Sequence, residues 1–194
     1  ALISASAVGF YGPRGDDLLQ EDATPGSDFL AQLCVAWEAA AAGAQRYGVR
    51  VVCLRFGVVL SSRGGALDKL RLPFRLGLGG PMGPVGHWFP WVHEDDAVGI
   101  ARFALEANWA GPVNVVAPEL VTMGELARAL GRTLRRPARL PLPVAVLRLV
   151  LGEFADSLSP GQKVVPTVAE SMGYEFKNPT LAEALGKSFG RKKA

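Results

Sequence analysis

The sequence predicts an α/β protein with a Rossmann-like parallel sheet, and three observations support this prediction. The chain opens with an apolar run of small residues, continues with an amphipathic helical pattern, and then enters a nearly continuous β-branched run. Strand, helix and strand in this order form a βαβ unit, which joins parallel strands. The 194 residues are 49% hydrophobic and 20% charged, which suits a packed core and excludes a disordered chain.

Turn and capping signals set the bounds of the first elements. We expect a strand over residues 2–8, and a helix that begins after Ser27 or Asp28 and ends at Gly48. The β-branched run over residues 49–60 predicts one strand buried on both faces. Helical spacing predicts a buried apolar face on the helix, made of Phe29, Leu30, Leu33, Cys34, Trp37, Ala41 and Ala44.

The later segments alternate in the same way. We expect a short amphipathic helix to about Leu76, a Gly/Pro loop over 77–86, an aromatic strand over 87–93, and a helix from Asp95 or Asp96. A strand over 112–117 precedes Thr122 and Glu125, which have the spacing of a capping box.

An extended linker from Pro137 leads to a small helical tail, in which we expect one short strand at 173–176. The sequence therefore divides into a Rossmann-like part, residues 1–141, and a small, mostly helical C-terminal lobe, residues 142–194.

Composition and charge exclude several classes of function. The net charge is only +3, and the arginine-rich segment 128–139 has no stacking aromatics within it, so we expect no nucleic-acid partner. Apolar stretches end well before the ~18 residues of a membrane span, so we expect no membrane contact and no signal peptide. Cys34 and Cys53 lie in apolar runs, which is typical of reduced cysteines in a cytoplasmic protein.

Two further motifs favour a structural interpretation over a binding site. The glycine loop over 77–86 precedes a strand and lacks both phosphate-binding signatures, so a turn-rich surface loop is favoured. His87 and His93 would share one face of the aromatic strand, but no third ligand accompanies them, and we expect no metal site.

Polar residues near the end of the first strand are the first candidates for a site. Ligands of open parallel sheets bind at the carboxyl ends of the strands. Ser6, and less so Ser4, would lie there, either bonded to a substrate carbonyl or back to the chain. Glu38 follows Trp37 on the helix, where it lies either at the edge of a pocket or on an exposed flank.

At this point a family resemblance covers essentially the whole chain. The blocks SASAVGFYG, DFLAQLCVAWEAAA, VVCLRFGVVL, PFRLGLGGPMGPVGHWFPWVHEDD, GPVNVVAPELVT and GQKVVP resemble the extended, atypical short-chain dehydrogenase/reductases, and more narrowly their epimerase-family branch. The segment from about Leu142 resembles that branch's C-terminal domain of unknown function. The resemblance implies that this chain is the later part of such a protein, and that the N-terminal half with its glycine-rich fingerprint is a missing partner.

The resemblance also implies an activity. It indicates an NAD(P)-dependent oxidoreductase or nucleotide-sugar-epimerase-like enzyme acting on an unidentified small molecule, with NADP favoured and NAD not excluded. Ser6 matches the superfamily's catalytic serine, whereas Cys34 and Glu38 stand at the tyrosine and lysine positions. Glu38 is then the candidate acid/base, and Tyr11, in the loop after the strand, is a second group expected to reach a substrate.

The remaining candidates line the cofactor and the substrate in the family. Gly57, Val58 and Val59 match the segment that approaches the nicotinamide, and Gly57 would allow a flat ring to come close. The substrate side is expected to contain Trp88, Trp91 and His93.

The alternative is a non-catalytic dinucleotide-binding module that has lost the Tyr/Lys pair. A Glu38 side chain that points into a cleft beside Ser6 favours the enzyme, and one held in a salt bridge on the helix surface favours the module. Assembly into a homo-oligomer is compatible with either hypothesis.

Overall fold

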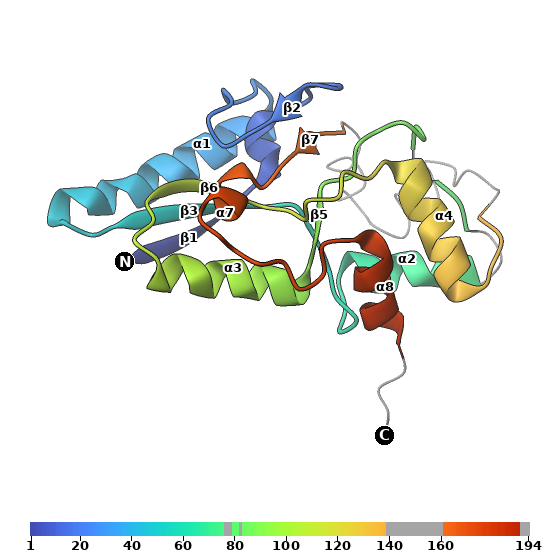
Figure 1. Ribbon diagram of the computed structural model, residues 1–194. Coiled ribbons are helices and arrows are strands. Elements are labelled where there is room, and N and C mark those ends of the chain that lie inside the picture. The colour runs from blue at the N-terminus through green and yellow to red at the C-terminus, as the bar shows by residue number, and fades with distance from the viewer. Residues whose placement is uncertain (76–78, 82, 139–160, 191–194) are drawn as a thin grey trace.

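The computed structural model describes residues 1–75, 79–81, 83–138 and 161–190 (Figure 1). Its elements are β1 (Leu2–Ala7), the 3-10 helix η1 (Val8–Tyr11), β2 (Leu18–Leu19), α1 (Phe29–Ala42), the 3-10 helix η2 (Gly43–Tyr47), β3 (Val51–Phe56), β4 (Val58–Leu60), α2 (Ala66–Arg75), β5 (Trp91–His93), α3 (Glu94–Glu106), β6 (Gly111–Val115), α4 (Met123–Leu134), β7 (Lys163–Val164), α7 (Thr167–Ser171) and α8 (Leu181–Phe189).

A parallel sheet of order β1-β3-β6 forms the centre of the fold. Helix α1 lies on one face of this sheet and α3 on the other, as Figure 1 shows. The predicted α/β class with a parallel sheet is therefore confirmed. Because the three strands run in one direction, their carboxyl ends meet at the same edge of the sheet.

The apolar run over residues 49–60 forms two strands instead of the single one predicted. β3 ends at Phe56, and β4 then leaves the central sheet to pair with β5. A Cβ atom on Gly57 would lie 2.8 Å from the carbonyl oxygen of Pro90 and 2.9 Å from Cγ1 of Val116. The chain can cross here between two sheets because Gly57 has no side chain.

The aromatic segment over 87–93 is a strand only at its end, so the prediction of one continuous strand was wrong. Pro90 has no amide hydrogen and cannot extend a ladder, and its carbonyl accepts from the amide of Val58 (2.8 Å). His87 and His93 therefore do not share a strand face. Helix α3 begins at Glu94 rather than at Asp95 or Asp96. His93 caps it, because Nδ1 of His93 accepts a hydrogen bond from the Asp95 amide (3.1 Å).

The helix starts follow their capping signals, whereas α1 ends at Ala42 and not at Gly48 as predicted. Asp28 caps α1 by accepting from the Ala31 amide (2.9 Å), and Gly48 ends the following 3-10 turn with a left-handed φ of 73°. The capping box of Thr122 and Glu125 at the start of α4 is confirmed.

The predicted buried face of α1 is largely wrong. Within α1, only Ala31 and Cys34 are buried, whereas Phe29 is 77% and Trp37 55% exposed. The helix approaches the sheet through small residues, because bulky side chains there would hold it away from β1. Leu30, Leu33 and Trp37 line a cavity instead.

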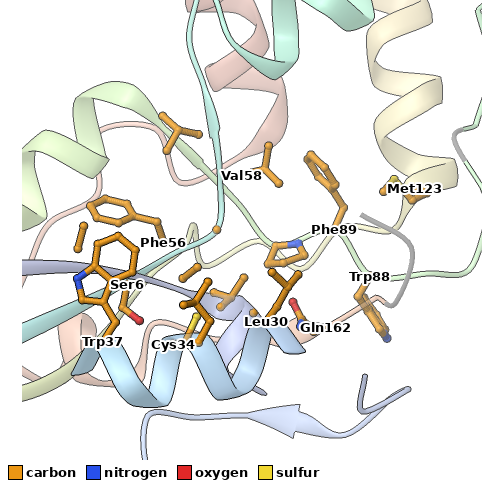
Figure 2. A pocket seen from close by; sticks show the side chains of 18 residues that line it. Ser6, Leu30, Cys34, Trp37, Phe56, Val58, Trp88, Phe89, Met123 and Gln162 are labelled. Atoms are coloured by element: carbon orange, nitrogen blue, oxygen red, sulfur yellow. The ribbon is translucent and has the colours of Figure 1, made fainter. Parts of the chain in front are cut away.

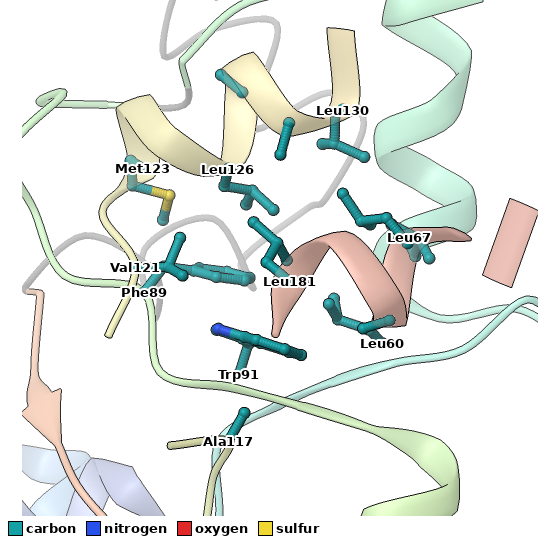
Figure 3. Packing of buried hydrophobic residues seen from close by; sticks show 14 of the residues in the cluster. Leu60, Leu67, Phe89, Trp91, Ala117, Val121, Met123, Leu126, Leu130 and Leu181 are labelled. Carbon is teal, nitrogen blue, oxygen red and sulfur yellow. The ribbon is translucent and has the colours of Figure 1, made fainter. Parts of the chain in front are cut away.

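Residues after 160 pack against the rest of the described chain. β7 pairs with β2, and α8 packs on α4, where Leu181 and Leu185 join the cluster around Trp91 (Figure 3). Residues 173–176 do not form the expected strand; Tyr174 and Phe176 make an edge-to-face ring contact (5.0 Å). The linker after Ala138 and the boundary at 141/142 lie outside the described residues.

One buried carboxylate attaches this tail to α3. Asp96 is 1% exposed, and it accepts hydrogen bonds from the amides of Lys177 (2.7 Å) and Asn178 (2.9 Å) and from the Tyr174 hydroxyl (3.1 Å). Bonds to a charged acceptor are about twice as strong as neutral ones.

None of the described helices is long and apolar enough to span a bilayer.

Candidate functional site

A cavity of about 490 Å³ lies at the carboxyl ends of β1 and β3 (Figure 2). Helix α1 forms one wall, the segment after β3 forms the back, and residues 88–90 close the far side. None of the described residues that line it is charged. The side chains shown around it include Ser6, Leu30, Cys34, Trp37, Phe56, Val58, Trp88, Phe89, Met123 and Gln162.

Ser6 brings the main polar group to this cavity from the end of β1. Its Oγ donates a hydrogen bond to Oε1 of Glu38 (2.7 Å). Glu38 also accepts two hydrogen bonds from Arg55, each 2.9 Å long, from Nε and Nη2. The pair is well shielded, with side-chain exposures of 14% for Glu38 and 4% for Arg55.

Strand register explains why these groups meet. Ser6 pairs with Arg55, and Arg55 pairs with Asn114 on β6, so three polar residues stand side by side across the sheet. Arg55 also donates to the Tyr11 hydroxyl (2.9 Å), which donates to Oδ1 of Asn114 (2.7 Å). The guanidinium lies over the ring of Phe10 at 3.5 Å, which adds a cation–π contact.

Tyr11 does not reach the cavity, contrary to expectation. It lies in η1 with no exposed surface, and its hydroxyl is held between Arg55 and Asn114. Burial raises the pKa of Tyr11 although the nearby Arg55 opposes that shift. Tyr11 is therefore a neutral part of the core network.

Glu38 combines both outcomes that the sequence left open. It lies beside Ser6, but it is held in a salt bridge and does not line the cavity. For Arg55, burial disfavours the charge, but the hydrogen bonds to Glu38 and Tyr11 and the charge of Glu38 outweigh burial, and the pKa of Arg55 is raised. Glu38 therefore reaches the cavity only through the hydroxyl of Ser6.

Cys34 lines the cavity next to Ser6. Burial raises the pKa of its thiol, against the Ala7 amide and the Ser6 hydroxyl, which lower it. Cys34 is thus a neutral thiol, and with Cys53 it is one of two free buried cysteines.

The expected cofactor segment lies at the back of the cavity, where Gly57, Val58 and Val59 all line it. The role expected of Gly57 needs correction, however. Its missing side chain makes room for Pro90 and Val116, as described above, rather than for a flat ring.

Of the three expected substrate residues, only Trp88 lines the cavity, and its Nε1 donates to Asp16 (2.7 Å). Trp91 is 1% exposed and donates to the Glu119 carbonyl (3.2 Å) in the core (Figure 3). His93 is 2% exposed at the start of α3. The resemblance placed both on the substrate side, whereas in the structure both are buried and neither lines the cavity.

Sequence reasoning missed several residues of the site. Arg55 had a usable signal, since a charged residue inside an apolar strand must find a partner. Gln162 had none, because it is placed by a hydrogen bond to the Gly12 carbonyl (3.1 Å) across the chain. In the described part of the chain, no three His, Cys, Asp or Glu side chains gather as metal ligands.

Comparisons with known proteins agree with this geometry. A protein of Mycobacterium bovis, "Epimerase family protein Mb2239", is 44% identical over 187 residues, which are 95% of this chain and 62% of that protein. Human epimerase family protein SDR39U1, crystallised with NADPH, is 41% identical with a TM-score of 0.86, over 95% of this chain and 63% of that one. By sequence and fold, the chain is similar to epimerase family proteins over 95% of its length. The predicted resemblance is confirmed.

Two further findings complete the comparison. Residues 142–187 match a family described as a domain of unknown function, DUF1731. The nucleoside-diphosphate sugar epimerase of Corynebacterium glutamicum is 34% identical with a TM-score of 0.77, over 97% of this chain and 37% of that one. This chain spans less than two thirds of the length of these relatives.

Proposed function

We propose that this chain forms the nicotinamide- and substrate-facing side of an NADP(H)-dependent, epimerase-like oxidoreductase acting on a small molecule. The observation that carries the proposal is the apolar cavity at the strand ends, with Ser6 at its wall. The NADPH named with the human relative favours NADP over NAD. Cys34 and Cys53 are free and buried, as is typical of proteins in a reducing compartment, and this supports a cytoplasmic location for the proposed enzyme.

The residues present fit the uncharged end of a dinucleotide. Phe56, Val58 and Trp37 provide apolar and aromatic walls for a flat ring. No described lining residue carries a positive charge, so the phosphates must be held by other groups. When bound, the nicotinamide supplies hydride transfer.

The exposed flank of this site suits the rest of the epimerase fold. β1 is an edge strand, with no hydrogen-bonded neighbour among the described residues on its outer side, and Phe29, Leu30 and Leu33 of α1 are exposed beside it. We propose that the part of the relatives not matched by this chain pairs along β1 and covers these side chains, because an open, apolar edge invites strand addition.

The alternative is a dinucleotide-binding module without turnover, and one observation favours it. Tyr11 and Glu38 are both engaged in the network around Arg55, and neither lines the cavity. The polar side chains that do line it are Ser6, Cys34 and Gln162 among the described residues. Any proton transfer would therefore pass through Ser6 or through a group on the bound molecule.

The test is a titration of the full-length protein with NADPH and NADH, followed by thermal shift. We expect NADPH to bind more tightly and to raise Tm, because a ligand that binds only the folded state stabilises it. No binding of either dinucleotide would overturn both hypotheses. Binding without oxidation of NADPH across a panel of carbonyl and nucleotide-sugar substrates would favour the module.

A further inference from the structure

The Ser6 hydroxyl donates its one hydrogen to Glu38. Oγ lies 2.7 Å from Oε1 of Glu38, and both carboxylate oxygens also accept from Arg55. A carboxylate that accepts hydrogen bonds from a guanidinium in this bidentate way has no hydrogen to donate. The direction of the bond is therefore fixed, with Ser6 as the donor and Glu38 as the acceptor.

The Ser6 oxygen keeps two lone pairs after this bond. Ser6 also lines the cavity (Figure 2), so the oxygen presents acceptor capacity to whatever the cavity holds. A ligand carbonyl at this place would set acceptor against acceptor, whereas a hydroxyl or an amide N–H would complete the hydrogen bonding.

We infer that Ser6 acts as a hydrogen-bond acceptor toward the cavity, so that this site recognises a donor, a hydroxyl or amide N–H, on an uncharged ring. Arg55 and Glu38 are the positioning residues that fix this polarity. The inference rests on the proposed function for its ligand, and it reverses the expectation that the serine holds a carbonyl. Two sources can supply the donor: the carboxamide of the cofactor or a hydroxyl of the substrate.

The first arm of the test compares NADPH with its 3-acetylpyridine analogue, in which a methyl group replaces the carboxamide nitrogen. Kd is measured for the full-length protein as wild type, as Ser6→Ala, and as Ser4→Ala. Ser4 faces the same side of β1 and does not line the cavity, so it is the matched control. If the carboxamide is the donor, wild type prefers NADPH by about five- to tenfold, and the preference is lost in Ser6→Ala alone.

The second arm compares cyclohexanol with cyclohexanone, without cofactor, by saturation-transfer NMR on the same proteins. A preference for the alcohol that depends on Ser6 assigns the donor to a substrate hydroxyl. Glu38→Ala frees the Ser6 hydrogen, so the donor preference falls to about one or reverses, an effect that a merely structural role would not produce.

Three results would overturn the inference. They are a preference for the ketone or the acetyl analogue, a preference for the donor ligand that survives Ser6→Ala, and no preference in either arm. Absence of NADPH binding in wild type overturns the proposed function alone, because the alcohol and ketone arm still reports on Ser6.

Discussion

Arg55 on the central strand holds Glu38 of α1 by two hydrogen bonds of 2.9 Å, across 17 residues of sequence. Sheet register places the guanidinium beside Ser6, and the helix places the carboxylate above it. The pair thus joins α1 to the sheet and orients the polar group of the cavity at the same time. Its energetic weight comes from burial, because a shielded charge that loses its partner cannot be solvated by water.

We predict that Glu38→Ala destabilises the protein by about 3 kcal/mol, because it leaves the buried guanidinium of Arg55 without its carboxylate. The measurement is urea unfolding followed by circular dichroism. The matched control is Glu106→Ala, which removes an equally short bond to Arg102 on the surface and is expected to leave the unfolding midpoint unchanged. Equal midpoints for the two variants would contradict the prediction.

Gly57→Ala is expected to cost about 1–3 kcal/mol of stability, because the new methyl group would lie 2.8 Å from the Pro90 carbonyl at the crossing from β3 to β4. Gly43→Ala is the control. Nothing lies within 4 Å of its Cβ position and its φ is −55°, so we expect no loss, or a gain of about 0.4–1 kcal/mol. Tm measurements on both variants check this, and a Tm for Gly57→Ala at the wild-type value would refute it.

The stability should fall as the pH drops below about 6.5, in part because of His93. Burial lowers the pKa of His93, and the nearby Lys187 lowers it further against the carboxylates of Asp95 and Asp96. The unfolded chain then binds a proton that the folded chain does not, so stability rises with pH through this window and is lost on acidification.

His93→Asn isolates this effect, since an uncharged side chain at the start of α3 can still accept from the Asp95 amide. Tm is compared between pH 5.5 and 7.5 for both proteins. Wild type should lose more stability on acidification than the variant. An identical pH dependence in the two would show that His93 makes no contribution.

Leu33→Glu should weaken NADPH binding by more than about tenfold, because it places a charge on the wall of an uncharged cavity. Val35→Glu puts the same charge on the same helix at a similarly exposed residue (38%) outside the cavity, and should leave the Kd unchanged. Dissociation constants from fluorescence titration of the full-length protein decide between these expectations. Equal effects of the two variants on Kd would argue against NADPH binding at this wall of the cavity.

The sequence by itself determined the elements whose signals are local. Asp28 and the Thr122–Glu125 pair mark helix starts because capping needs only residues within one turn. The order of strand, helix and strand set a parallel sheet, and the family resemblance placed Ser6 at its edge.

Only the tertiary structure decided what these elements face. Helical spacing identified the apolar stripe of α1, but periodicity does not say whether a stripe meets a sheet or a cavity, and Trp37 meets the cavity. Pro90 ended a strand that composition alone extended. Trp91 and His93 lie in the core because distant segments pack over them. The partners of Glu38 also come from distant segments, so the polarity of Ser6 is a property of the folded sheet and not of any local motif.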